Sequence, residues 1–137
     1  MVLVRELMTV NPNTIHPNMS LIQALDLMAD VACRQLPVLE NGLLVGIITD
    51  RDMRLATRTP AFDLDSINRS EFNKIEVSEF MTPDPLAIDP DAPIQEAAKI
   101  LNQNGIGALP VVEGGILLGI LTVYDILDYV SKLPSIA

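Results

Sequence analysis

Histidine and cysteine are almost absent from this chain, which contains one residue of each. The single cysteine, Cys33, rules out an internal disulfide bond and is typical of a reducing compartment; its apolar surroundings predict a packed thiol. The sequence shows no His, Cys, Asp or Glu cluster at metal-ligand spacing, no GxxxxGK phosphate loop and no Ser-His-Asp arrangement. We therefore predict no metal site and no catalytic residues.

Basic residues and long apolar runs are also scarce. The chain contains nine Lys and Arg residues and eighteen Asp and Glu residues. The resulting net charge of −9 argues against non-specific binding to nucleic acid. The longest apolar runs, such as residues 116–123, are far shorter than the roughly 20 residues that a membrane helix needs. The N-terminal residues do not have the pattern of a signal peptide. We expect a cytoplasmic protein with neither a membrane nor a nucleic-acid partner.

What the chain does contain is an internal repeat. Met8-Thr9 recurs as Met81-Thr82, a shift of 73 residues (81 − 8 = 73). The same shift relates Ile15 to Ile88, Pro17 to Pro90, Leu36-Pro37-Val38 to Leu109-Pro110-Val111, Gly46 to Gly119, Thr49 to Thr122, and Asp52 to Asp125. A repeat of this length indicates two supersecondary units that stack on one another and form two related clefts. We predict a first repeat at 1–58, a connector at 59–76 and a second repeat at 77–137.

Each repeat is predicted to have the order strand, helix, strand, strand, helix, which is an α/β (α+β) fold. An extended segment (13–16; 86–89) precedes an amphipathic helix, and a hairpin follows with its turn at 41–42 or 114–115. The second hairpin strand is almost wholly apolar, which predicts burial on both faces. The last helix is expected to begin at Thr49 or Thr122.

The predicted helices carry local signals as well. Ser20 followed by Gln23 is a capping-box pattern, and Pro93 suits the start of the corresponding helix. Glycine at 105 suits a left-handed helix end. The expected buried stripes are Leu21, Leu25, Met28 and Ala32 in the first helix, and Ile94, Ala97, Ala98 and Leu101 in the second. We expect Phe62 and Phe72 to attach a connector that contains at most a helical turn.

The junction between the last strand and the last helix shares the pattern Gly-apolar-apolar-Thr-x-x-Asp in both repeats. Free N–H groups at a helix N-terminus attract anions, and the threonine hydroxyl can donate to a phosphate. An aspartate one turn further on can accept hydrogen bonds from ribose hydroxyls. The same spacing is also that of a capping box, in which both side chains satisfy the helix backbone and nothing binds. Spacing alone leaves both interpretations open.

The doubled unit, with its Met-Thr lead-in, its Pro-Val strand and its Thr-x-x-Asp junction, resembles the CBS domain, named after cystathionine β-synthase. Two such units in tandem resemble a CBS pair, or Bateman module, and the resemblance covers residues 4–55 and 77–128. It implies a regulatory module whose clefts bind adenosine compounds such as AMP, ADP, ATP or S-adenosylmethionine. It also implies that such modules pair into disc-like dimers.

The resemblance assigns roles to particular residues. The hydroxyl that contacts phosphate falls on Thr49 and Thr122, and the ribose carboxylate on Asp52 and Asp125. Adenine is implied to lie against the extended segment and the Pro-Val strand, where backbone groups read the base edge and Ile and Val form an apolar wall. The residues at these positions are Thr14, Ile15, His16 and Val38 in the first repeat, and Ala87, Ile88, Asp89 and Val111 in the second.

Positive charge is concentrated in the first repeat. Residues 1–55 carry six acidic and four basic side chains, whereas residues 77–137 carry eight and two. Arg51 follows the first junction and Arg34 precedes the Pro-Val strand; their counterparts are Tyr124 and Gly107. We therefore expect a phosphorylated ligand in the first-repeat cleft. The second is expected to hold a nucleoside-like ligand or nothing, unless arginines of the other repeat or another subunit reach it.

Taken together, these features predict a non-catalytic module that senses an adenine nucleotide in the cleft between its repeats and changes conformation or partner affinity. No cofactor is required, and the nucleotide binds alone or with Mg²⁺. The expected partners are the adenosine-containing molecule, a second copy in a homodimer and a separate effector protein. The alternatives are an assembly module without a nucleotide, a binder of S-adenosylmethionine, and an enzyme that hydrolyses a nucleotide.

Overall fold

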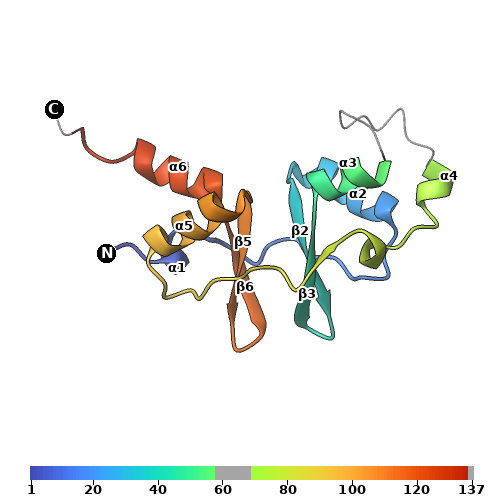
Figure 1. Cartoon of the computed structure of the whole chain (residues 1–137), viewed down its shortest axis with the longest axis horizontal. Coiled ribbons are helices and arrows are strands. Elements are labelled where there is room, and N and C mark those ends of the chain that lie inside the picture. The colour runs from blue at the N-terminus through green and yellow to red at the C-terminus, as the bar shows by residue number, and fades with distance from the viewer. Residues whose placement is uncertain (58–68, 136–137) are drawn as a thin grey trace. The chain divides into compact units, whose positions relative to one another are not determined.

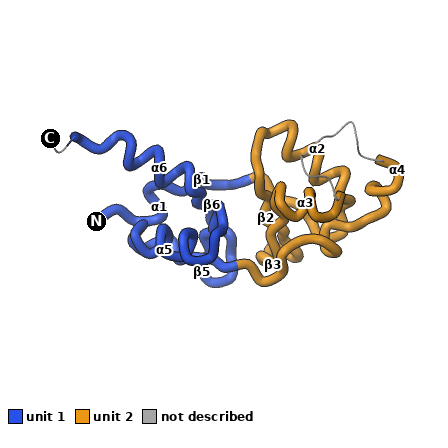
Figure 2. The backbone as a smooth tube through the Cα atoms, turned by 45° about the horizontal axis from the view of Figure 1, so that its top comes forward, with its two compact units in different colours: residues 1–12, 86–137 blue, residues 13–85 orange. Residues whose placement is uncertain are grey.

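A computed structural model describes residues 1–57 and 69–135 of the protein (Figure 1). The chain divides into two compact units, of which unit 1 is Met1–Pro12 with Leu86–Ala137 and unit 2 is Asn13–Pro85 (Figure 2). Each unit holds the body of one sequence repeat and the lead-in segment of the other. The predicted boundaries follow the sequence repeats and therefore do not show this exchange.

Unit 2 is built around the β3 strand, which pairs antiparallel with β2 on one edge and β4 on the other. Ahead of the first helix, Ile15 forms a parallel bridge with Val38. The described elements are α2 (Leu21–Val31), β2 (Gln35–Glu40), β3 (Leu43–Thr49), α3 (Asp50–Thr57), α4 (Arg69–Phe72), the 3₁₀ helix η2 (Val77–Glu79) and β4 (Thr82–Pro83).

Unit 1 repeats this plan around β6, which pairs antiparallel with β5 and β1. Ile88 forms the parallel bridge with Val111. The elements are α1 (Val4–Leu7), β1 (Thr9–Val10), α5 (Ile94–Asn104), β5 (Ala108–Glu113), β6 (Ile116–Thr122) and α6 (Val123–Ser131). The mixed helix and strand content and the antiparallel hairpins confirm the predicted β-α-β-β-α repeat.

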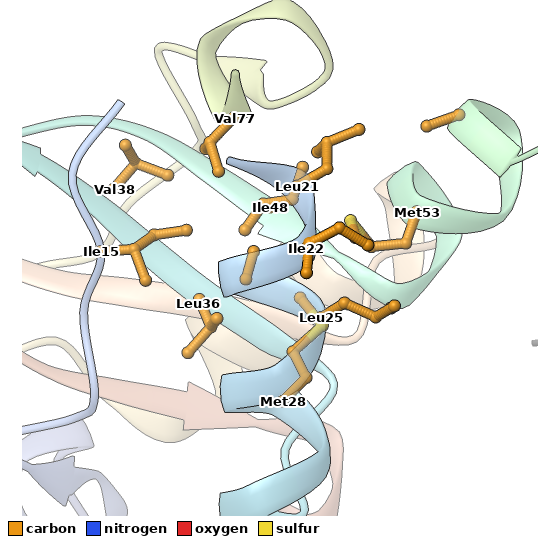
Figure 3. Packing of buried hydrophobic residues seen from close by; sticks show 12 residues of the cluster. Ile15, Leu21, Ile22, Leu25, Met28, Leu36, Val38, Ile48, Met53 and Val77 are labelled. Carbon is orange, nitrogen blue, oxygen red and sulfur yellow. The ribbon is translucent and has the colours of Figure 1, made fainter. Parts of the chain in front are cut away.

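Each unit has its own hydrophobic core. In unit 2 the helix face of α2 packs against β2 and β3 (Figure 3). The lead-in segments complete these cores, because Val77 and Val4 have no exposed surface and pack into unit 2 and unit 1, respectively. Burial of one such apolar side chain is worth about 1.5–3 kcal/mol, so each exchanged lead-in stabilises the unit that receives it.

Backbone hydrogen bonds hold the lead-ins in equivalent places. Val77 N–H donates to Met19 O at 2.8 Å in unit 2, and Val4 N–H donates to Ala92 O at 2.9 Å in unit 1. In each unit a methionine of the Met-Thr pair then lies over a strand glycine: Met81 over Gly46 and Met8 over Gly119. The Met-Thr pair of each repeat is therefore in contact with a strand of the other repeat, although the two are far apart in the sequence.

Several local predictions are confirmed. Ser20 Oγ accepts from Gln23 N–H at 3.1 Å, and Gln23 Oε1 accepts from Ser20 N–H at 2.9 Å, which completes the capping box of α2. Gly105 ends α5 in the left-handed conformation with φ 61°. Asn41 and Gly42 have φ of 53° and 79°, as a type I′ turn requires. Phe72 packs against the unit 2 core.

Other predictions are wrong in detail. Ala32 is not part of the buried stripe, because α2 ends there with φ 53° and the side chain is exposed. The second hairpin strands are buried only toward their C-terminal ends; Leu43 and Ile116 are 51% and 57% exposed at the turn. The short helices and two-residue strands of the lead-ins were not predicted. Phe62 lies outside the described residues.

Candidate functional site

The first junction lies where β3 passes into α3. Asp52 Oδ2 accepts from Thr49 N–H at 2.9 Å and from the Thr49 hydroxyl at 3.0 Å, while Asp52 N–H donates to Thr49 Oγ1 at 3.1 Å. The two side chains thus satisfy backbone groups at the start of α3, and both are half-buried. The capping-box interpretation describes this junction. The other carboxylate oxygen, Asp52 Oδ1, accepts from the Thr82 hydroxyl at 3.4 Å.

The second junction, between β6 and α6, has the same backbone arrangement. Thr122 N–H donates to Asp125 Oδ2 at 2.8 Å, and Asp125 N–H donates to Thr122 Oγ1 at 3.2 Å. Within residues 1–57 and 69–135, the Thr122 hydroxyl donates to no group and Asp125 Oδ1 accepts from none. This junction therefore leaves one hydroxyl proton and one carboxylate oxygen available, where the first junction uses its hydroxyl proton on Asp52.

The extended segments pass beside the Pro-Val strands. Ile15 N–H donates to Pro37 O at 3.0 Å and Leu39 N–H donates to Ile15 O at 2.8 Å. The Ile15 and Val38 side chains are 4% and 0% exposed and belong to the core (Figure 3). Because backbone groups of successive residues point to opposite sides of an extended chain, the groups left for a ligand come from the neighbours of Ile15.

Those neighbours are Thr14, which is half-buried, and His16, which is exposed. The His16 ring nitrogen Nδ1 accepts from Asn18 N–H at 3.2 Å, which is the local contact of a residue at a chain turn. In unit 1, Ile88 has the same two backbone bonds, to Pro110 O and from Val112 N–H, both at 3.0 Å. Ala87 is exposed, whereas Ile88 and Val111 are buried.

Three arginines of the first repeat, Arg34, Arg51 and Arg54, are on the surface of unit 2. Arg34 and Arg51 are exposed and form no ion pair within the described parts of the chain, whereas Arg54 lies 3.8 Å from Asp50. Arg34 O also accepts from Asp50 N–H at 2.9 Å, which ties the residue before β2 to the first residue of α3. This backbone bond places the backbone of Arg34 beside the start of α3.

The equivalent bond in unit 1 runs from Val123 N–H to Gly107 O at 2.9 Å, but no arginine stands at either position. The structure thus brings all the predicted first-repeat residues into unit 2 and all the predicted second-repeat residues into unit 1. The two junctions share one backbone geometry and differ in the neighbouring sequence: Arg34 and Arg51 stand at the first, with no ion pair among the described residues, where Gly107 and Tyr124 stand at the second.

A cluster of acidic side chains in unit 1 escaped the sequence analysis. Carboxylate oxygens of Asp89, Asp91 and Glu113 lie within 4.8 Å of one another on the surface. Arg5 Nε donates to Asp91 Oδ1 at 2.7 Å, and this hydrogen bond lowers the pKa of Asp91. A guanidinium therefore already neutralises part of the cluster. Asp89 and Asp91 are close in the sequence, but Glu113 is distant from both, so the spacing does not reveal the third member.

Burial rather than reactivity characterises the single cysteine. Cys33 is half-buried beside the unit 2 core, and desolvation raises the pKa of its thiol. A thiol in this environment stays protonated at neutral pH and is a poor nucleophile. The predicted packed thiol is confirmed. Of the helices in the described residues, none combines the length and apolar character that crossing a bilayer requires.

Two β-α-β-β-α units with the same strand-to-helix junction define a tandem-repeat module. The family model for the CBS domain matches residues 4–58 and 77–132, and the chain belongs to this family. A CBS domain-containing protein of Dictyostelium discoideum is 39% identical over 134 residues, which cover 96% of this chain and 92% of that protein.

Two solved structures with bound ligands have the same fold. The chain is similar to CBSX2 in complex with AMP, with a TM-score of 0.84 and 26% identity, covering 98% of this chain and 100% of that one. It is also similar to the CBS domain pair of protein MJ0100 in complex with 5′-methylthioadenosine and S-adenosyl-L-methionine. Here the TM-score is 0.80 and the identity 27%, with 96% and 97% of the two chains covered.

Proposed function

We propose that this chain is a non-catalytic regulatory module that binds an adenine nucleotide and converts its occupancy into a change in conformation or partner affinity. The observation that carries the proposal is the pair of junctions at which a threonine hydroxyl and an aspartate carboxylate lie within one helical turn. The AMP complex of CBSX2, a protein of the same fold, supports the choice of ligand class.

In the first repeat the phosphate is expected to lie near the N-terminus of α3. There the helix dipole favours an anion, and Arg34 and Arg51 are exposed and free of ion pairs among the described residues. The Thr49 hydroxyl donates to Asp52 Oδ2 at 3.0 Å, so it has to rotate before it can donate to phosphate. The guanidinium groups of Arg34 and Arg51 can add charge-assisted bonds to the same phosphate.

The adenine base is expected to contact backbone groups of Thr14 and the N–H of His16. The backbone of Ile15 is already bonded to the Pro-Val strand, and His16 O accepts from Met19 N–H at 3.1 Å. Ala87 and Asp89 have the equivalent places in the second repeat. The buried side chains of Ile15, Val38, Ile88 and Val111 would then hold these segments in position rather than form an open apolar wall. Asp52 and Asp125 would accept from the ribose.

A second candidate ligand class fits the second repeat better. Thr122 and Asp125 have an unused hydroxyl proton and an unused carboxylate oxygen among the described groups, but Val123 and Tyr124 supply no positive charge. A ligand that has the ribose and lacks phosphate suits this combination. The 5′-methylthioadenosine and S-adenosyl-L-methionine in the structure of the MJ0100 pair are ligands of this kind.

The mechanism of regulation follows from linkage. A ligand shifts a conformational equilibrium only by the difference between its affinities for the two states. Binding at a junction adds contacts to the end of a strand, the start of a helix and an extended segment of one unit. The output is then passed to a separate effector protein or to a second copy of the chain. No cofactor is required, and Mg²⁺ would enter only with a nucleotide that carries it.

Thermal unfolding with AMP, ADP, ATP, S-adenosylmethionine and GTP tests the proposal. A ligand at about a hundredfold its dissociation constant stabilises the protein by about 2.7 kcal/mol, which raises the unfolding midpoint by several degrees. We expect this rise with adenine compounds and not with GTP. An unchanged midpoint with all five would reject the nucleotide sensor and favour an assembly module.

We also propose that the chain forms a homodimer through α6. Tyr124, Leu127 and Val130 follow one another at intervals of three residues on this helix and are 65%, 55% and 53% exposed. Their spacing places them in one strip along α6, which borders Val123 and Ile126, and those two side chains pack against the unit 1 core. Apolar side chains exposed in this way indicate a contact surface for another chain.

Leu127→Glu is expected to weaken self-association at least tenfold, since a charged side chain would be buried without a partner in the interface. Sedimentation velocity across a concentration series measures the effect. Ile116→Glu is the matched control, because Ile116 is equally exposed (57%) but lies at a hairpin turn away from α6. A monomeric wild type, or a dimer that tolerates Leu127→Glu, would contradict the proposal.

A further inference from the structure

The aspartates of the two junctions have different neighbours. The Thr82 hydroxyl of β4 donates to Asp52 Oδ1 at 3.4 Å in unit 2. The counterpart of Thr82 in unit 1 is Thr9, and in the described residues no hydrogen bond joins Thr9 to Asp125. Strand pairing does not explain the difference, since Thr82 is opposite Ile47 in β3 just as Thr9 is opposite Ile120 in β6. The two units therefore differ in how the threonine and aspartate side chains are placed, and not in the register of the strands.

Asp52 can offer a ligand only one of its oxygens. Oδ2 accepts the N–H of Thr49 at 2.9 Å, and breaking this bond would uncap the start of α3. A ribose hydroxyl therefore has to approach Oδ1, where the Thr82 hydroxyl already lies. We propose that Thr82 is a specificity-determining residue of the first-repeat site, whose hydroxyl competes with a ligand's ribose for Asp52 Oδ1. This inference rests on the proposed function.

Because β4 is fixed to unit 2, we expect a ligand to displace the Thr82 hydroxyl by rotation of the side chain and not by movement of the strand. Val77 is fully buried and Met81 lies against Gly46, so the chain on the N-terminal side of Thr82 is fixed to unit 2. Thr82 itself is exposed, and its side chain can turn without disturbing the core. A ribonucleotide has to replace one long hydrogen bond, whereas a ligand without ribose hydroxyls does not meet this competition.

The effect on affinity is correspondingly modest and measurable. The net value of a hydrogen bond of this kind corresponds to about two- to tenfold in a dissociation constant. Thr82→Val removes the hydroxyl and keeps the branched shape that suits a strand. Thr82→Ser retains the hydroxyl. Thr9→Val makes the same change at the equivalent position of unit 1, where the hydroxyl does not contact an aspartate, and serves as the matched control.

Calorimetric titration of the full chain with AMP and with 2′,3′-dideoxy-AMP tests the proposal. Thr82→Val is expected to bind AMP two- to tenfold more tightly than the wild type, with Thr82→Ser and Thr9→Val unchanged. Dideoxy-AMP is expected to bind all four proteins equally, because it has no hydroxyl to place on Asp52. Weaker or unchanged AMP binding by Thr82→Val would overturn the inference, as would an equal gain for dideoxy-AMP.

The same titrations separate this inference from the proposed function. If neither the wild type nor any variant binds AMP, the nucleotide sensor is rejected and the role of Thr82 is rejected with it. If all four proteins bind AMP with one affinity, the sensor stands and only the role of Thr82 fails. Thermal unfolding of each variant checks that the substitution at the exposed threonine leaves the fold intact.

Discussion

Replacing Asp52 with alanine is expected to weaken AMP binding by about 1–3 kcal/mol, or roughly five- to 150-fold, the range for losing a hydrogen bond to a charged group. Oδ1 of this carboxylate takes no part in the helix cap and is the acceptor that we assign to the ribose. Calorimetric titration at a temperature well below the unfolding midpoint measures the loss. ADP and ATP are expected to show the same loss, because their ribose is the same.

Asp125→Ala is the matched control for this experiment. Both aspartates accept from a threonine N–H at a helix start, at 2.9 and 2.8 Å, so both substitutions should lower the free energy of unfolding by about 1 kcal/mol. Only Asp52→Ala is expected to reduce the affinity for AMP strongly. If Asp125→Ala abolishes binding while Asp52→Ala leaves it intact, the phosphorylated ligand occupies the second repeat and our assignment is wrong.

Where a structure depends on neighbours in the sequence, the sequence predicted it well. The capping box of α2, the left-handed end of α5 and the type I′ turn each follow from two or three adjacent residues. Ala32 shows the limit of this approach. Its spacing fits the apolar stripe, but α2 has already ended there, because helix length is decided by the chain's path into β2.

The exchange of the lead-in segments was beyond prediction for a different reason. β1 and β4 are two residues long, so they carry no period that indicates a partner. Val4 and Val77 read as ordinary apolar residues, and their complete burial depends on which unit receives them. Partner choice of this kind is a tertiary property, and the repeat pattern is the same whether or not the lead-ins are exchanged.

At the candidate site, one sequence pattern predicted both a helix cap and a ligand contact, and one threonine and one aspartate can provide both. Thr-x-x-Asp indicated either a capped helix or a ligand site, and the structure shows the cap at both junctions. The cap uses one carboxylate oxygen and leaves the other, so the two roles are compatible. The sequence could not reveal that Thr82 approaches Asp52 from another strand, because nothing in the spacing of 30 residues indicates that contact.

The largest expected effect on stability comes from Gly119→Ala. A Cβ atom at this position would lie 2.6 Å from the backbone oxygen of Thr9 and 2.9 Å from Met8 Sδ. The Thr9 oxygen belongs to β1, which is paired with β6, so it cannot move without breaking the ladder. We expect a loss of about 1–3 kcal/mol in the free energy of unfolding, toward the upper end of the range for overpacking, measured by urea denaturation.

Gly46→Ala at the equivalent position should cost less. Its Cβ would lie 2.5 Å from Met81 Sδ but 3.0 Å from Thr82 O, so the severe contact is with a flexible side chain that can change rotamer. Met81→Ala should therefore recover much of the loss in Gly46→Ala, whereas Met8→Ala should recover little in Gly119→Ala. Gly107→Ala, with no atom within 4 Å, is the neutral control. Equal losses at 46 and 119, or equal rescue by the two methionine substitutions, would show that backbone contact is not what makes Gly119 necessary.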